Sequence, residues 1–259
     1  MRLNQYLNKI EQGEAINLDR FIACLPYSDP QEWRRIYQAT RVRGGYQLTI
    51  LAPERHRALF TPILQDRISA AKSGRSHDFS GSFAHVLVLN RCCESLVPFV
   101  VLSDARGFKT SGQLVGKRAV IIENQENFYC YRAFLTALDQ PDLAESCDIL
   151  LGSGNQICHR LNHRFLAEYE VIYCAQDLDS GGLSIYQSLK KSLPQCHWLA
   201  PPDWDLHRDK FRLAPKSADQ LAKAIKLARE LGLTQEADLM NQTRAFLEQE
   251  AFLPALPQD

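Results

Sequence analysis

Two kinds of hydrophobic pattern alternate along the second half of the chain. Short runs that are apolar throughout alternate with segments whose apolar residues recur every three or four positions, the spacing of amphipathic helices. Strands that are apolar on both faces are typical of a parallel sheet covered by helices on both sides. The expected strands are 118–124, 147–155, 170–179 and 195–202, and the expected helices are 128–139, 156–169 and 181–193, with two tail helices at 217–233 and 235–253.

The first hundred residues have a different order of elements. Two segments with helical spacing precede a hairpin signal at Gly44 and Gly45, the second opening at Asp29 with Pro30 at its first helical position. Helix, helix and basic hairpin is the order of a winged helix-turn-helix, although short helices before a hairpin are also common in other folds. The expected elements are helices 18–25, 29–40 and 53–71, a hairpin at 41–51, a polar linker at 72–82, strands 85–90 and 98–104, and a loop at 104–118.

These patterns predict two domains. Residues 1–116 are expected to form a smaller α+β, winged-helix-like domain, and residues 117–259 an α/β domain with a parallel sheet, flanking helices and a helical tail. A hydrophobic content of 45% and a charged content of 23% suit a globular chain with a sizeable core. The chain therefore has the composition to fold both parts.

The sequence contains no sign of export or of a membrane span. The stretch 1–12 is too polar for a signal peptide, and no apolar run approaches the roughly 20 residues that a membrane span needs. The 8 cysteines include no CxxC pair, which favours buried reduced thiols over disulfides or a zinc site. We expect a cytoplasmic protein.

The net charge of zero conceals an uneven distribution. Residues 1–116 contain 15 Lys and Arg against 10 Asp and Glu, and the remainder has the opposite imbalance. A basic front is suited to a polyanion such as DNA, although an imbalance of this size is also common in proteins that bind none. The candidate phosphate contacts, which bracket the expected second helix and hairpin, are Arg34, Arg35, Arg41 and Arg43.

Acidic side chains follow two of the expected parallel strands. Glu123 comes directly after the first strand, and Asp177 and Asp179 come after the third. Ligands of parallel sheets bind at the carboxyl ends of strands, and residues two apart on a strand point to one face. Three neighbouring carboxylates repel one another unless a cation neutralises them, and Mg²⁺ with carboxylate and water ligands is usual in phosphate chemistry. Glu123 is expected to be either a metal ligand or a general acid/base.

Several other readings of these acids stay open. A strand-terminal Glu is often simply solvated, and a D-x-D pair also occurs in phosphatases of the haloacid dehalogenase type. In those phosphatases the first Asp is a nucleophile, usually near the N-terminus, and Glu123 would have no role. A third alternative is a non-catalytic module that binds DNA or an assembly partner; three intact acids argue against it.

Two further groups of polar residues are candidate metal ligands. His159 and His163 are spaced to share a helical face beside Cys158, but His159 lacks the following Glu of the H-E-x-x-H motif. A basic or solvated helix face is favoured there. Past the fourth strand, one of Asp203, Asp205 and His207 is a candidate extra ligand, with a polar loop as the default reading.

The acids and glycines together resemble a known pattern. Glu123, the turn Gly152-Ser153-Gly154 and the series Asp177, Asp179, Gly182 match the order of the TOPRIM fold of topoisomerases, primases and nucleases. Within it, "ENQENF" and "DLDSGGLSIYQSLKKSLP" look like the nuclease subunits of Wadjet- and Mks-type systems, the JetD and MksG proteins, and so does the closing "FLEQEAF" (246–252). These proteins are similar in turn to the A subunit of type IIB topoisomerases.

The resemblance implies a Mg²⁺- or Mn²⁺-dependent nuclease that cleaves plasmid DNA beside a condensin-like SMC/kleisin complex in plasmid defence, as a homodimer. Carried over to this sequence, the metal and catalytic residues are Glu123, Asp177 and Asp179, with Asn124, Gly154 and Gly182 supporting them.

The chain also departs from these relatives. Gln176 stands where Gly is frequent, Ser180-Gly181 stands where Pro is frequent, and the front of the chain is shorter than in JetD. Tyr37 has the position of a topoisomerase nucleophile, but a tyrosine packed in the core is the favoured reading.

Overall fold

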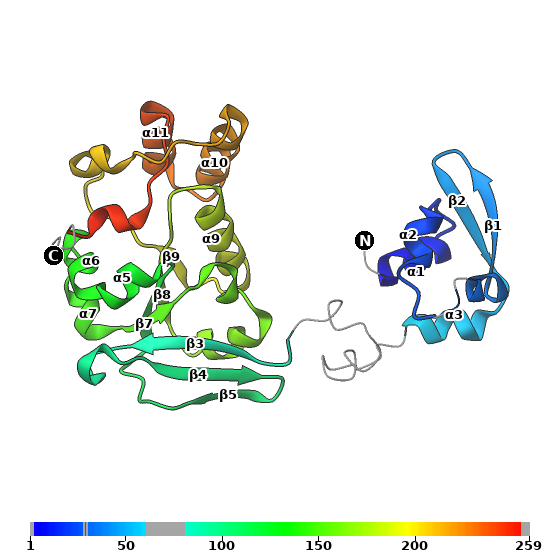
Figure 1. Ribbon diagram of the computed structural model, residues 1–259, viewed down its shortest axis with the longest axis horizontal. Coiled ribbons are helices and arrows are strands. Elements are labelled where there is room, and N and C mark those ends of the chain that lie inside the picture. The colour runs from blue at the N-terminus through cyan, green and yellow to red at the C-terminus, as the bar shows by residue number, and fades with distance from the viewer. Residues whose placement is uncertain (1–2, 28, 30, 61–80, 255–259) are drawn as a thin grey trace. The chain divides into compact units, whose positions relative to one another are not determined.

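The protein folds into two units, one before residue 80 and one beginning at Gly81. The structure is a computed structural model, and it describes residues 3–27, 29, 31–60 and 81–254. None of the helices in these residues is long and apolar enough to cross a bilayer. Figure 1 draws both units; the N-terminal one has one hydrophobic core and the C-terminal one has two.

In its described residues, the N-terminal unit packs three α-helices against a two-stranded sheet. Its core centres on side chains that are almost completely buried, including Leu7, Phe21 and Tyr37. The loop residue Ile16 pairs with Tyr46 and so joins the helices to the hairpin. The elements are α1 (Leu3–Glu11), α2 (Leu18–Ile22), a 3-10 helix (Glu32–Arg35), the antiparallel pair β1 (Tyr37–Val42) and β2 (Gly45–Ile50), and α3 (Pro53–Phe60).

The predicted hairpin is confirmed, but the helix predicted for 29–40 is wrong. The backbone N–H of Gln31 bonds to the Asp29 side chain, a single 3-10 helix follows, and β1 begins at Tyr37. Pairing of the whole segment 37–42 with β2 supplies backbone hydrogen bonds that outweigh its weak helical spacing. Pro30, the rest of the helix predicted for 53–71 and most of the predicted linker lie outside the described residues.

The C-terminal unit is a mixed seven-stranded sheet with helices on both faces. The strand order is β5-β4-β3-β7-β6-β8-β9, with parallel pairing among β7, β6, β8 and β9 and antiparallel pairing elsewhere. The strands are β3 (Ala84–Leu89), β4 (Phe99–Asp104), β5 (Gly107–Thr110), β6 (Arg118–Ile122), β7 (Asp148–Leu151), β8 (Val171–Ala175) and β9 (Cys196–Trp198).

The apolar side chains of β6 show how the sheet is covered. Val120 and Ile122 pack into one core, against α5 (Gln125–Tyr129), α6 (Tyr131–Ala137) and α7 (Asp142–Ser146). Ala119 and Ile121 pack into the other, against α8 (His163–Leu166) and α9 (Ser180–Ser192). This confirms the predicted α/β core with a strand buried on both faces. Cys147, Cys174 and Cys196 are buried and reduced, as predicted.

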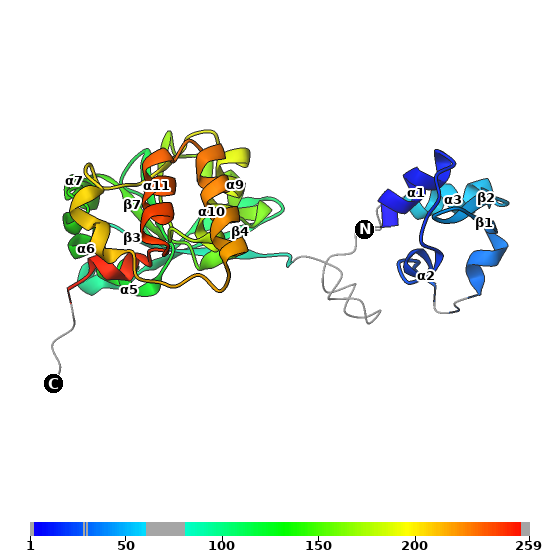
Figure 2. The same cartoon turned by 90° about the horizontal axis from the view of Figure 1, so that it is seen from above.

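The tail forms two helices and then returns to the sheet domain. Helices α10 (Ala218–Glu230) and α11 (Thr234–Thr243) lie side by side in both views (Figures 1 and 2). A final 3-10 helix, Gln249–Phe252, coloured red, lies beside α5 in Figure 1. The single helix predicted for 235–253 is therefore two elements with an extended segment between them.

The division between the two units differs from the predicted boundary at 116/117. Residues 84–110 form β3, β4 and β5, which extend the sheet of the C-terminal unit instead of belonging to the N-terminal one. The pairing of β3 with β7 makes the two parts one sheet. β5 also occupies a segment that was predicted to be loop, where Asp104 accepts hydrogen bonds from the backbone of Arg106 and Gly107 and turns the chain into a hairpin.

Candidate functional site

The strand order reverses at β6. The chain passes from β6 to β7 on one side and later returns to β8 on the other side, with all three strands parallel. Such a reversal is where open α/β sheets bind ligands. The residues after these strands are Glu123, the turn Gly152–Gly154, and Asp177 to Asp179. The sheet therefore brings together segments that are distant in sequence.

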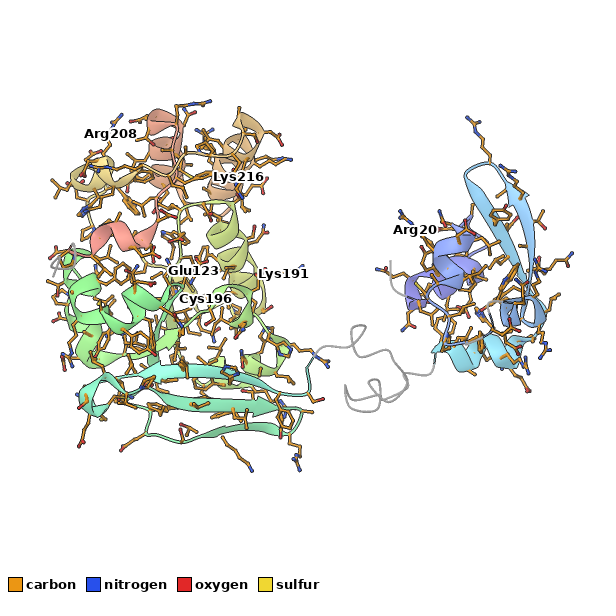
Figure 3. All side chains as sticks on the ribbon, viewed as in Figure 1. Arg20, Glu123, Lys191, Cys196, Arg208 and Lys216 are labelled. Carbon is orange, nitrogen blue, oxygen red and sulfur yellow. The ribbon has the colours of Figure 1, made fainter. Side chains whose placement is uncertain are left out.

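Glu123 and Asp177 are in direct contact at this edge. The backbone N–H of Asp177 donates to Glu123 Oε2 at 3.1 Å, and the Glu123 N–H donates to the Ala175 carbonyl at 3.1 Å, which prolongs the β6–β8 pairing. Glu123 is partly buried and lies well inside the outline of the unit in Figure 3. Glu123 therefore reaches the backbone of the D-x-D segment across the sheet.

The Asp177 carboxylate is held by two donors. Its Oδ1 accepts from the backbone N–H of Gln249 at 2.8 Å and from the Asn124 side-chain amide at 3.2 Å, whereas Oδ2 receives only a 3.5 Å contact from Asn124. The same Asn124 nitrogen donates to Glu250 Oε2 at 2.8 Å. Asn124 therefore joins carboxylates from two distant parts of the chain.

Asp179 has a different environment from Asp177. Its Oδ1 accepts from the backbone N–H groups of Gly181 and Gly182, both at 2.8 Å, and so caps the N-terminus of α9. Leu178, between the two acids, is buried and pairs with Leu247. Asp179 is thus a helix cap whose charge still acts on Glu123, and its other oxygen, Oδ2, has no hydrogen-bond partner among the described residues.

Two glycines allow close packing at the site. A Cβ on Gly182 would lie 2.2 Å from the Asp177 carbonyl oxygen, and a Cβ on Gly152 would lie 3.2 Å from the Cα of Glu123. Gly182 is needed because the first turn of α9 packs against the backbone of Asp177. Gly154 has a φ of +59° in the turn after β7, a conformation that favours glycine.

The carboxyl groups at this site are close enough to raise one another's pKa values. Burial is the main cause that raises the pKa of Glu123, and the charges of Asp179 and Glu250 add to it. Burial, followed by the charges of Glu123 and Glu250, raises the pKa of Asp177 to about 7, against the opposing hydrogen bonds from Gln249 and Asn124. Such shifts mark carboxylates that lack a positive partner.

Residues 108–255 match the family model of the Wadjet protein JetD, C-terminal. The chain belongs to this JetD family. The match covers the parallel strands, all the acids described above and the final 3-10 helix. Membership connects the chain with Wadjet systems, which contain several proteins. No curated protein matches the chain.

Glu250 is the site residue that the sequence did not identify. Its segment was already noted for its likeness to the JetD group, but no strand or motif spacing placed it near Glu123. The pairing of Leu178 with Leu247, together with the Asn124 contact, brings it there. A carboxylate inside a segment with family likeness was the one available signal.

The site of this JetD-family chain suits a divalent cation by its chemistry, although its ligands are not preassembled. Within the described residues, no three Asp, Glu, His or Cys side chains form a group that could hold a metal ion as placed. The donor set is nevertheless one of hard carboxylate oxygens whose raised pKa values a cation would relieve. Two neighbouring amides, Gln176 and Gln249, are buried and carry polar atoms without partners among the described residues. The residues that would hold the cation are Glu123, Asp177 and Asp179.

The other candidate ligands lie in different settings. His159 and His163 do not share a helix: His159 Nδ1 accepts from the Leu161 N–H ahead of a short 3-10 helix, and His163 begins α8. The His207 and Phe252 rings meet edge to face with centroids 5.0 Å apart, and Asp203 accepts a hydrogen bond from the backbone N–H of Asp205. The shared helix face expected for the two histidines is therefore wrong, whereas Asp203 and Asp205 lie in a polar turn, as favoured.

The predicted DNA contacts and Tyr37 lie in the N-terminal unit. Arg34, Arg35, Arg41 and Arg43 are all exposed, the first pair on the 3-10 helix and the second on the hairpin. Tyr37 is 1% exposed, its hydroxyl lies 2.7 Å from His56 Nδ1, and burial raises its pKa. Tyr37 is a core residue, as favoured, although it begins β1 instead of lying in a helix.

Proposed function

We propose that this JetD-family protein is a Mg²⁺- or Mn²⁺-dependent endodeoxyribonuclease with a TOPRIM catalytic domain. It nicks or cuts plasmid DNA together with a condensin-like SMC complex. The observation that carries the proposal is the contact of Glu123 with the Asp177 backbone, with the charge of Asp179 also acting on Glu123, where the strand order reverses. A site of gathered carboxylates suits a polyanionic substrate only with a cation between them.

The reaction proposed is hydrolysis of a phosphodiester bond. A water oxygen forms the new bond to phosphorus, the bond from phosphorus to the leaving sugar oxygen breaks, and that oxygen takes up a proton. A divalent cation bound at these acids would neutralise phosphate charge and lower the pKa of water. Glu123 has the raised pKa that suits a proton acceptor, and it is equally placed to be a ligand.

The N-terminal unit supports the proposal as a DNA-binding part. Its exposed arginines are placed on the 3-10 helix and on the hairpin, the positions that a winged helix offers to phosphates. One acidic site per chain cuts one strand, so double-strand cleavage is proposed for a homodimer. The SMC complex would deliver the DNA and relieve low activity of the isolated chain.

The test is cleavage of supercoiled plasmid with Mg²⁺ or Mn²⁺, for the chain alone and with its SMC complex. Glu123→Ala and Asp177→Ala should each lower nicking by roughly a hundredfold or more, because both acids touch the reacting phosphate or its cation. Glu126→Ala is the matched control, since Glu126 is exposed on α5 one turn away. It should cut like the wild type.

Three results would contradict the proposal. Equal nicking by wild type, Glu123→Ala and Asp177→Ala would remove these acids from the reaction. Release of phosphate from small monoesters without any effect on plasmid would favour a phosphatase. DNA binding without cleavage, even with the SMC complex present, would leave a non-catalytic assembly module.

A further inference from the structure

The C-terminal segment 245–252 forms part of the acidic site. Leu247 pairs through its backbone with Leu178, the residue between Asp177 and Asp179. Phe246 pairs in the same way with Leu213, and the Phe252 ring packs against the rings of Phe134, Trp204 and His207. The segment is therefore fixed on both sides of residues 248–250.

Within this segment, neighbouring acids have opposite environments. Glu248 is exposed, Gln249 is only 4% exposed, and Glu250 is partly buried with Oε2 bound by Asn124. The Asn124 nitrogen lies within 3.2 Å of oxygens from both Glu250 and Asp177. One neutral amide thus holds two carboxylates as neighbours, an arrangement that costs free energy unless a positive charge is shared between them.

A buried polar atom beside these acids gives a separate indication of a ligand. Gln249 donates its backbone N–H to Asp177, while its side-chain Oε1 is buried without a hydrogen-bond partner among the described residues. Gln176, directly before Asp177, is fully buried, and neither its Nε2 nor its Oε1 has a hydrogen-bond partner among the described residues. Buried polar atoms are normally satisfied by protein, water or ligand, so this region has unused capacity to orient a hydrated ion.

We propose that Glu250 is a fourth carboxylate of the divalent-cation site and that Asn124 positions it beside Asp177. The inference rests on the function proposed above and deepens it. It assigns the ligand set to four segments: the ends of β6 and β8, the cap of α9 and the C-terminal segment. Four carboxylates carry more negative charge than one divalent cation neutralises. We therefore expect that some of them bind the ion through water, or that a second cation binds together with the phosphate.

The experiment is calorimetric titration of Mn²⁺ into the full chain. Glu250→Gln removes the charge but keeps a side-chain oxygen that accepts from Asn124, so the variant should fold like the wild type. Its Mn²⁺ affinity should be about tenfold weaker or more, because affinity follows the number of charged ligands. Glu248→Gln removes an exposed charge two residues away and should bind like the wild type. Asn124→Ala should also weaken binding, and Glu250→Asp should recover part of it.

The outcomes separate this inference from the proposed function. A wild type that takes up no Mn²⁺ would remove the metal site itself. Binding that is lost in Asp177→Asn but intact in Glu250→Gln would overturn only the role of Glu250. Equal weakening by Glu248→Gln and Glu250→Gln would reduce the effect to general charge. Thermal unfolding without metal checks that each variant folds, and Glu250→Asp replaces Glu250→Gln if that one does not.

Discussion

Gly182 gives the sharpest test of the site's packing, through the substitution Gly182→Ala. The added Cβ would lie 2.2 Å from the carbonyl oxygen, 2.8 Å from the nitrogen and 3.0 Å from the carbonyl carbon of Asp177. All three are backbone atoms, so no flexible side chain can move aside. Helix α9 or the Asp177 backbone must shift by about 1 Å to reach an ordinary carbon–oxygen separation.

The expected cost follows from what that shift disrupts. Overpacking in a well-packed interior costs about 1–3 kcal/mol. The displaced Asp177 also weakens its N–H bond to Glu123 and the bond its carboxylate accepts from Gln249, each worth about 0.5–1.5 kcal/mol. Alanine regains about 1 kcal/mol over glycine inside a helix. The net loss in free energy of unfolding is about 3 kcal/mol, or roughly 6–12 °C in Tm.

Gly181→Ala is the matched control for this measurement. Its Cβ would meet only atoms of the Asp179 carboxylate, the nearest being Oδ1 at 3.2 Å, and the residue is likewise in the first turn of α9. Thermal unfolding followed by circular dichroism should place Gly181→Ala near the wild type and Gly182→Ala well below it. Equal melting of the two variants would refute the close approach of α9 to Asp177.

Three other predictions concern both units. Tyr37→Phe should lower the free energy of unfolding by about 1–2 kcal/mol, because His56 Nδ1 loses its hydrogen-bond partner. Plasmid cleavage should stay unchanged; its loss would support Tyr37 as a nucleophile. Burial raises the pKa of Asp148, so its carboxylate should contribute a loss of stability as pH rises from about 4, in addition to the losses from Glu123 and Asp177. Asp148→Asn should make the loss smaller than in the wild type in urea titrations at several pH values; parallel curves would contradict this. Arg41→Gln and Arg43→Gln should each weaken DNA binding for all sequences and lower its salt dependence by about one charge; an unchanged salt slope would exclude them as phosphate contacts.

The parallel part of the sheet could be predicted from sequence because its strands are apolar enough to require burial on both faces. The run from Ala119 to Ile122 is apolar at every position, which requires cover on both faces, and the structure provides it. The segment 84–110 also has apolar runs, at 86–89 and 99–102, but β4 exposes Val100 and Leu102 on one face. Its membership of the same sheet follows from the pairing of β3 with β7, and local patterns do not encode long-range pairing.

Short helical segments were predicted less well because local hydrogen bonds compete with helix. The stretch 156–169 has helical spacing, but the His159 ring accepts from the Leu161 N–H and the Asn162 amide donates to the Gln156 carbonyl. These side chains satisfy backbone groups outside an α-helix, so the chain forms two short 3-10 turns and then α8. The segment 29–40 fails for a related reason at Asp29.

The acidic site shows the same division between local and distant information. Glu123, Asp177 and Asp179 were predictable because strand ends and strand order fix their positions. Glu250 was not, because its position depends on an antiparallel pairing between Leu178 and Leu247, which the hydrophobic pattern of the sequence does not predict. The C-terminal segment lies inside the family match, which extends to residue 255, and its Gln249 N–H donates to the Asp177 carboxylate. A chain ending after α11 would keep every predicted acid and lose the backbone donor that orients Asp177.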